Sequence, residues 1–334
     1  MDARRFELTA SPHIKGPDST PRIMWSVVGS LVPVIAVAIY WFGPSAALVI
    51  TAATAGCVFT ERVFGPGGTL NDGSAAITGL LLGLTLPPGL PLWMAFVGGI
   101  IAIGLGKLVF GGLGQNVFNP ALLGRAMLQA AFPDDMTSWP AAVERWSQLR
   151  GDNFALPLMS ADEAVTVSGA TPLGQMKFEQ IPTETFDLFF GATAGSTGET
   201  AAVVILIGGG YLALRKYLNW RIPISILLTV AVLSQIAHWA VPDRVPDAAF
   251  MLFSGGLMLG AWYMATDMVT SPTTNLGCWI FGAGIGAMVV LIRLWGGLPE
   301  GVMYAILLMN ALVPFINRAT QPRVFGTGRE AVVS

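Results

Sequence analysis

Long apolar segments separated by short polar connections occupy most of the chain. They cover residues 23–42, 44–62, 74–92, 92–112, 118–132, 200–218, 222–240, 248–266, 277–295 and 300–317. Most approach the roughly 20 residues that an α-helix needs to cross the hydrocarbon core of a bilayer. The fifth is shorter, and the third is interrupted by Pro-Pro-Gly-Leu-Pro at 87–91. The pattern predicts an all-α integral membrane protein with about ten transmembrane helices.

Composition supports this prediction. Charged residues make up 11% of the chain and apolar residues 53%, whereas soluble domains have about 25% charged residues. No run of Lys and Arg is longer than two residues, which argues against a nucleic-acid partner. The partner that this composition favours is membrane lipid.

The Lys and Arg residues sort by compartment when these segments are taken as membrane spans. Most fall in the termini or in loops on the same side as the termini, as do Arg4, Arg215 and Arg318. By the positive-inside rule, both termini are then cytoplasmic. The predicted organisation is a cytoplasmic arm (1–22), a five-helix half (23–132), an extracytoplasmic loop (133–199), a second five-helix half (200–317) and a cytoplasmic tail (318–334).

Short similar segments occur in the two halves of the chain. Asn-Pro-Ala-Leu at 119–122 resembles Asn-Ala-Leu at 310–312, and Leu-Leu-Gly-Leu at 81–84 resembles Leu-Met-Leu-Gly at 257–260. Since each half has an odd number of spans, a duplication would produce an inverted-topology repeat. Chance agreement between helices rich in Gly and Leu is the alternative.

Metal-ligating residues are scarce. Cys57 and Cys278 are the only cysteines and lie in apolar segments, while His13 and His238 are far apart in the sequence. These four residues do not form a ligand set for an iron–sulfur cluster or a pair of axial haem ligands. If the chain carries electrons by itself, it requires an organic cofactor.

The predicted extracytoplasmic loop contains a hydroxyl group between small residues. The segment consists of Ser168, Gly169, Ala170, Thr171, Pro172 and Leu173. A turn explains this composition without a function. The position of Thr171 on an outer loop, however, makes its hydroxyl accessible to a bulky modification.

A second glycine-rich stretch, at 191–200, ends the same loop. It lacks the Lys-Ser/Thr that follows a phosphate-binding loop. Ser196 and Glu199 have the spacing of a capping box, so we expect them at the start of the helix predicted at 200–218.

Four further polar residues lie within or between the predicted spans. Asn116 and Asn119 belong to a glycine-rich run before a short apolar segment that contains Arg125, and Asp267 lies in a polar break between two segments. Ionisable groups at membrane depth are costly and often functional. We therefore consider all four as candidates for a cofactor site or an ion path. The alternative is a structural kink for Asn116, Asn119 and Arg125, and capping of the next helix for Asp267.

Three segments resemble a known family. They are Ser-Gly-Ala-Thr-Pro-Leu at 168–173, Gly-Gly-Leu-Gly-Gln-Asn-Val-Phe-Asn-Pro-Ala-Leu-Leu-Gly-Arg at 111–125, and Ala-Thr-Asp-Met-Val-Thr-Ser-Pro at 265–272. The chain resembles, over nearly its whole length, the family that contains the D subunit of the Rnf ion-translocating oxidoreductase and the B subunit of the Na⁺-pumping NADH:quinone oxidoreductase. The short N-terminal arm favours the Rnf subunit.

The resemblance implies that a flavin transferase joins FMN, through its phosphate, to the hydroxyl of Thr171. The transferase motif often has an acidic residue three positions before the serine. This chain has Val165 there, and its nearest acids are Asp162 and Glu163. The departure concerns recognition by the transferase and leaves the acceptor hydroxyl in place.

The resemblance also implies a function and partners. The chain is expected to be a redox subunit of an ion-pumping ferredoxin:NAD oxidoreductase in the bacterial inner membrane, passing electrons between the iron–sulfur and flavin centres of partner subunits while Na⁺ or H⁺ is moved. The likeness to the quinone-reducing relative adds a noncovalent riboflavin to the expected cofactors and a fold like that of urea and ammonium channels. The alternatives are a channel-like transporter of a small polar solute without covalent flavin, and a scaffold for a peripheral redox protein.

Overall fold

The computed structural model describes residues 18–66, 69–139, 149, 153–157, 171–181, 183–191, 193–198, 202–242 and 244–322. Within these residues the regular secondary structure consists of helices alone. Five helices are long and apolar enough to cross a membrane, and three shorter ones are also apolar. The prediction of an all-helical membrane protein is therefore confirmed for the part that is described.

The first group of helices runs from Thr20 to Thr137. It contains α1 (Thr20–Phe42), α2 (Pro44–Phe64), η1 (Thr69–Asp72), α3 (Ser74–Thr85), α4 (Leu92–Ile103), η2 (Gly104–Leu108), α5 (Pro120–Ala131) and α6 (Pro133–Thr137). Helix α2 packs against both α3 and α4, and α4 packs against α5. Gly79 and Gly83 of α3 lie directly against the α2 backbone at Thr54 and Ile50. Small residues at these positions allow the close approach that helix packing in membranes requires.

The second group begins with short helices from the segment that the sequence predicts as the extracytoplasmic loop. It contains α7 (Pro172–Gly174), η3 (Gln175–Glu179), α8 (Thr185–Phe190), α9 (Ala202–Leu214), α10 (Arg221–Ala240), α11 (Ala248–Phe253), α12 (Leu257–Leu259), η4 (Gly260–Met264), α13 (Asn275–Trp295) and α14 (Val302–Thr320). Helix α10 packs against α11 and α13, and α13 packs against α14. Gly282 and Gly286 of α13 face Ser225 and Thr229 of α10.

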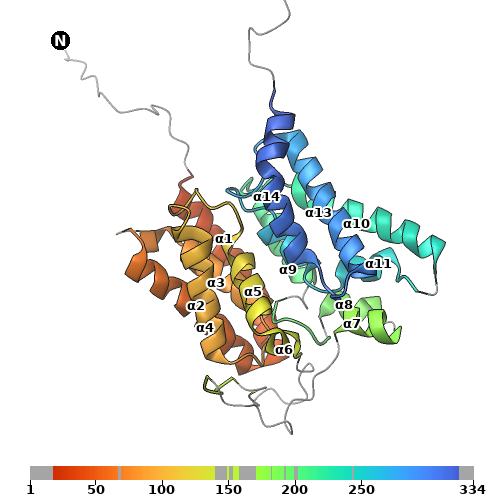
Figure 1. The fold of residues 1–334 in the computed structure, drawn as a ribbon, viewed down its shortest axis with the longest axis horizontal. Coiled ribbons are helices and arrows are strands. Elements are labelled where there is room, and N and C mark those ends of the chain that lie inside the picture. The colour runs from red at the N-terminus through yellow and green to blue at the C-terminus, as the bar shows by residue number, and fades with distance from the viewer. Residues whose placement is uncertain are drawn as a thin grey trace, which may run out of the picture.

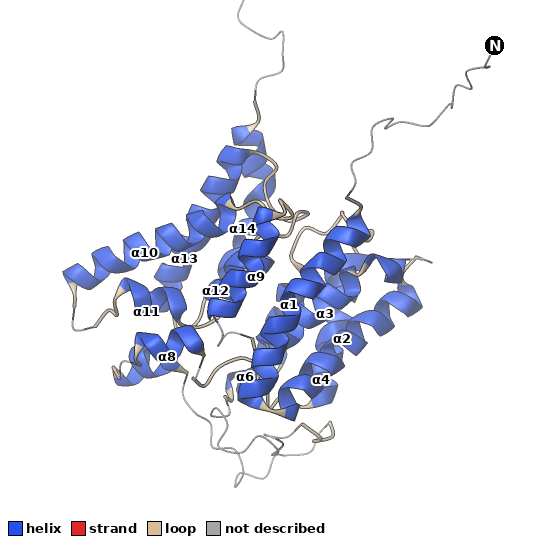
Figure 2. Cartoon of the chain, turned by 180° about the vertical axis from the view of Figure 1, so that it is seen from behind, coloured by secondary structure: helices blue, strands red, loops and turns tan. Residues whose placement is uncertain are grey.

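The two groups lie side by side, with the first in red to yellow and the second in green to blue (Figure 1). The same division is visible from behind (Figure 2). They touch through α1 with α9 and through α5 with α14. Many of the long helices keep large apolar side chains exposed, including Ile207, Leu228 and Leu291. Such an extensive exposed apolar surface suits contact with lipid better than contact with water.

Every predicted apolar segment contains helical residues, but two of them are interrupted. Helix α3 ends at Thr85, before Pro87 and Pro88, because proline disfavours helix at the residue before it and cannot donate to the helical ladder. The segment at 248–266 is broken between α11 and α12, where Gly255 has a φ of +63°. Ten membrane crossings therefore remain a prediction.

The capping-box prediction is wrong for Ser196, and its second member, Glu199, lies outside the described residues. Ser196 is buried and its hydroxyl has no hydrogen-bond partner. The next residue, Thr197, instead donates its hydroxyl to the carbonyl of Gly83 at 2.6 Å, and Gly198 donates its backbone N–H to the carbonyl of Leu84 at 2.7 Å. The segment thus satisfies carbonyl groups that the early end of α3 leaves without helical partners.

Candidate functional site

Thr171 is placed at the start of α7. Its Oγ1 accepts a hydrogen bond from the backbone N–H of Gly174 at 3.1 Å, and Pro172 occupies the first helical turn. The residue is partly exposed, whereas Pro172, Leu173 and Gly174 are buried. The hydroxyl therefore lies at the boundary between a packed turn and the surface. Ser168, Gly169 and Ala170 of the predicted motif lie outside the described residues.

A cavity of about 40 Å³ adjoins Thr171. Its lining includes Leu173 from the same turn, Gly255 at the break between α11 and α12, and Glu300 before α14. A Cβ atom at residue 255 would lie 2.6 Å from Cδ1 of Leu173. Glycine is therefore required for this close approach, as well as for the positive φ.

Lys177 attaches the Thr171 segment to the end of α13. Its Nζ donates to the backbone carbonyls of Gly296 at 2.6 Å, Leu298 at 2.9 Å and Ile292 at 3.3 Å. Partial burial lowers the pKa of the Lys177 ammonium. The carbonyls of Gly296 and Leu298 lie beyond the end of α13, so no following helical turn supplies N–H donors for them.

Arg125 lines a neighbouring cavity of about 70 Å³ together with Glu300. Its Nη2 lies 3.7 Å from Oε2 of Glu300, whose Oε1 accepts a hydrogen bond from the backbone N–H of Gly256. Arg293 approaches the same break from α13 and donates to the carbonyls of Met251 at 2.6 Å and Ser254 at 2.9 Å. Sequence reasoning did not select Glu300 or Arg293. The sequence could have indicated Arg293 as a candidate site residue, because it is a charged residue inside an apolar segment.

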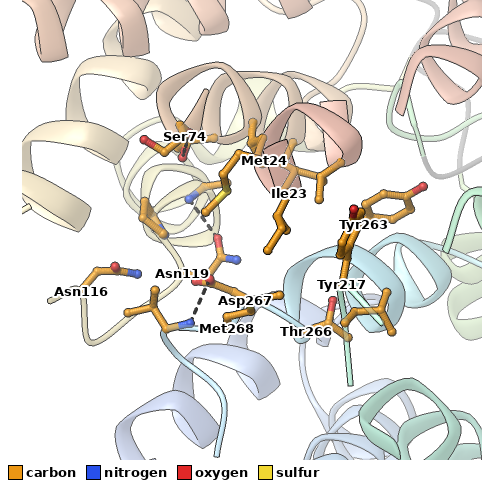
Figure 3. A pocket seen from close by; sticks show the side chains of 18 of the residues that line it. Ile23, Met24, Ser74, Asn116, Asn119, Tyr217, Tyr263, Thr266, Asp267 and Met268 are labelled. Atoms are coloured by element: carbon orange, nitrogen blue, oxygen red, sulfur yellow. Dashed lines mark hydrogen bonds between the residues drawn. The ribbon is translucent and has the colours of Figure 1, made fainter. Parts of the chain in front are cut away.

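A cavity of about 120 Å³ lies between the two groups of helices. Asn116, Asn119 and Asp267 all line it, and Figure 3 shows Asn119 and Asp267 near the middle of the view with Asn116 to their left. The structure thus brings three of the four candidate polar residues together. Arg125 is separate from them and belongs to the cavity beside Glu300.

Hydrogen bonds hold these three side chains in place. Oδ1 of Asn119 accepts from the backbone N–H groups of Ala121 at 3.0 Å and Leu122 at 3.3 Å, which caps α5. Asn119 therefore caps α5.

The Asp267 carboxylate accepts from the N–H of Val269 and from the hydroxyl of Thr270, each at 3.2 Å, and the Asn116 amide donates to the carbonyl of Phe118 at 3.3 Å. The alternative given for Asp267, capping of the next helix, is not seen, because Thr274 is the N-cap of α13.

One polar atom beside this cavity has no partner. Trp262 lines the cavity, and its indole Nε1–H is buried without a hydrogen-bond acceptor. Tyr217 and Tyr263 also line it. A buried donor without an acceptor is costly, so an aromatic ligand with polar edges fits this lining.

A buried ion pair borders the same cavity. Lys107 of η2 lies with its Nζ 2.6 Å from Oε1 of Glu61 on α2, and it also donates to Oγ of Ser74 at 2.6 Å. Ser74 in turn donates to Oδ1 of Asp72 at 2.5 Å. Sequence reasoning did not select Glu61, which lies near the end of an apolar segment. The described residues contain no group of three or more His, Cys, Asp or Glu suited to a metal ion.

These features define a multi-pass membrane protein with a partly exposed threonine hydroxyl beside one cavity and a second, polar cavity between two helical groups. A family model described as "NQR2, RnfD, RnfE family" matches residues 7–326, so the chain belongs to this family. The resemblance inferred from the sequence is confirmed.

Similar proteins carry related names. The chain is 43% identical to the D subunit of the proton-translocating ferredoxin:NAD(+) oxidoreductase complex of Clostridium ljungdahlii, covering 97% of each chain. It is 42% identical to the D subunit of the ion-translocating oxidoreductase complex of Stutzerimonas stutzeri over 92% of each. It is 39% identical to the D subunit of the Na(+)-translocating ferredoxin:NAD(+) oxidoreductase complex of Acetobacterium woodii, covering 98% of this chain and 97% of the relative.

Proposed function

We propose that the chain is the membrane redox subunit of an ion-pumping ferredoxin:NAD oxidoreductase complex and carries FMN on Thr171. The names of its relatives support the complex. The observation that carries the flavin proposal is the placement of Thr171, whose partly exposed hydroxyl stands beside a cavity. A flavin transferase would catalyse attack of this hydroxyl on the FMN phosphorus of a flavin dinucleotide. The new phosphodiester bond replaces the pyrophosphate bond, and a nucleoside monophosphate leaves with the hydroxyl proton. The bound isoalloxazine would supply one-electron transfer.

Two contacts of this chain fix the position of the segment that would carry the flavin. Leu173 packs against Gly255, and Lys177 fixes η3 to the end of α13. The attachment residue is therefore held between two contacts to the second group of helices. A fixed attachment site restricts the distance between the flavin and the redox centres of its partners. The rate of electron transfer depends on that distance. Those partners are the iron–sulfur and flavin subunits of the complex.

We also propose that the cavity between the helical groups binds a noncovalent riboflavin. Supporting features are the unpartnered Nε1–H of Trp262, the tyrosines in the lining, and the amides of Asn116 and Asn119. The isoalloxazine ring offers both an aromatic face and a polar edge, which this lining matches. The Asn116 amide, which donates to the carbonyl of Phe118, would be oriented by that bond.

The fold that fits this role has ten spans in two inverted five-helix halves, resembling urea and ammonium channels. Corresponding helix contacts in the two halves support the repeat. Helix α2 packs against α3 and α4 as α10 packs against α11 and α13. Helix α4 packs against α5 as α13 packs against α14. In this topology the termini are cytoplasmic, the Thr171 loop is extracytoplasmic, and the membrane is the bacterial inner membrane. The coupled ion is Na⁺ or H⁺, since relatives of both names occur.

A denaturing gel tests the covalent flavin. The full chain, produced with the flavin transferase, is expected to give a band with flavin fluorescence, and Thr171→Ala is expected to abolish it. Thr193→Ala is the matched control, because Thr193 lines the same cavity and is not the acceptor. A dark band from the unmodified chain would contradict the proposal and favour the channel-like transporter.

A further inference from the structure

Tryptophans stand near both ends of two neighbouring long helices in the second group. Trp220 directly precedes α10 and contacts Trp279, near the start of α13, with ring centroids 6.2 Å apart. Trp239 lies one residue before the end of α10, Trp295 ends α13, and both are exposed. Tryptophan concentrates at the two interfaces between membrane and water. The 20 residues of α10 extend for about 30 Å, which is the approximate thickness of the hydrocarbon core.

Helices α10 and α13 run in the same direction, so their final tryptophans belong to the same interface. Gly282 of α13 approaches Ser225 of α10. Four positions further along both helices, Gly286 approaches Thr229. The level at which these two helices end is therefore one boundary of the membrane, and we call it the tryptophan boundary.

Lys177 places η3 at the tryptophan boundary. Its Nζ donates to the carbonyls of Gly296 at 2.6 Å and Leu298 at 2.9 Å, immediately after Trp295. The next residue of η3 is Phe178, and it is 68% exposed. An aromatic side chain is thus held, largely uncovered, where the membrane-spanning part of α13 ends.

Helix α8 has an aromatic face beside one that packs on the protein. On the packed side Leu188 is buried, and Phe189 contacts Phe253 of α11 with ring centroids 5.1 Å apart. Phe186 and Phe190 are four positions apart and share another face, with ring centroids 4.6 Å apart. They are 69% and 47% exposed. Two adjacent phenyl rings left in water would lose the free energy that burial of apolar surface provides.

The remaining exposed positions of η3 and α8 include acidic residues. Glu179, Glu184 and Asp187 are all exposed. A short element with aromatic rings on one side and charged groups on another suits the plane of a membrane interface. The negative charges favour a zwitterionic lipid surface over an anionic one, because like charges repel.

We propose that η3 and α8 form an interfacial element that lies on the lipid bilayer at the tryptophan boundary. Phe178, Phe186 and Phe190 insert between the headgroups and upper acyl chains of a zwitterionic phospholipid leaflet. The bond from Lys177 to the end of α13 makes this surface continuous with the lipid-facing surface of the long helices. Thr171, which precedes α7 and η3 in the chain, is thereby held close to the membrane surface. The inference goes beyond the proposed flavin and does not require it.

A fluorophore on α8 tests this placement. The full chain with Phe186→Cys is labelled with an environment-sensitive fluorophore and placed in phosphatidylcholine nanodiscs. We expect strong quenching by a phospholipid that carries a nitroxide near its headgroup, and weak quenching by iodide in the water. Asp187→Cys is the matched control on the same helix and is expected to show the reverse. Cys57 and Cys278 are fully buried, so the unmodified chain serves as the labelling blank.

The outcomes separate lipid from water and from protein. Strong iodide quenching of the Phe186→Cys label would overturn the inference, since it would place this face in water. Protection from both quenchers would also overturn it, since a second copy of the chain would then cover the face. Phe190→Cys reports on the same face independently, and thermal unfolding shows that each labelled variant keeps its fold. A dark gel band at Thr171 would remove the proposed flavin and leave these quenching results unaffected.

Discussion

Asn119 donates its side-chain amide to the backbone carbonyl of Met264 at 3.1 Å, joining residues 145 positions apart. The same side chain caps the start of α5 through its oxygen. One asparagine therefore holds the end of η4 in the second helical group against the start of α5 in the first. Both ends border the cavity between the two groups, so the stability of the interface and the shape of this cavity depend on the same residue.

Replacing Asn119 by Ala should reduce both stability and noncovalent flavin binding. Loss of the helix cap alone costs about 1 kcal/mol, and the bond to Met264 is lost as well. We expect a lower midpoint of thermal unfolding and less riboflavin released on denaturation. Fluorescence in the gel band should persist, because Thr171 is on a separate element. Unchanged riboflavin content in Asn119→Ala would argue against its role in the cavity.

Replacing Gly255 by Ala should destabilise the protein and disturb the packing of Leu173, which helps to hold the Thr171 segment. A non-glycine residue at φ +63° is strained by about 1–3 kcal/mol, and the added methyl group meets Leu173. Thermal unfolding in detergent measures the effect. Gly297→Ala is the control, because a Cβ there meets nothing within 4 Å and φ is not positive. Equal midpoints for the two variants would contradict the packing described.

Replacing Lys177 by Met should loosen the segment that carries Thr171. The variant loses three donor bonds to backbone carbonyls, whereas Lys177→Arg keeps donors there. Hydrogen exchange over residues 171–181 is expected to be faster in the Met variant and nearer to that of the unmodified chain in the Arg variant. Lys216→Met, at an exposed site, should leave this exchange unchanged. Identical exchange in Lys177→Met would show that other contacts hold the segment.

Breaking the buried pair of Glu61 and Lys107 should be costly, and removing both charges should cost less than the two single changes together. A single uncompensated buried charge destabilises by about 3–5 kcal/mol. We expect Glu61→Gln and Lys107→Met each to lower the unfolding midpoint, with partial recovery in the double variant. Purely additive effects would contradict coupling across the 2.6 Å contact.

The sequence alone determined the helical membrane class, the approximate position of each apolar segment and the likeness to the family. These properties follow from composition and local order, since a run of apolar residues must satisfy its backbone internally when it lies in lipid. The Thr171 segment was recognisable for the same reason, because its residues are consecutive. Pro87 and Pro88 also indicated the early end of α3.

Only the tertiary structure decided which distant residues share a site. It placed Asn116, Asn119 and Asp267 at one cavity and separated Arg125 from them. It paired Arg125 with Glu300 and assigned Thr197, rather than a capping box at Ser196, to the end of α3. These relationships depend on how helices far apart in the chain pack together, and the hydrophobic pattern of one helix does not contain the position of another.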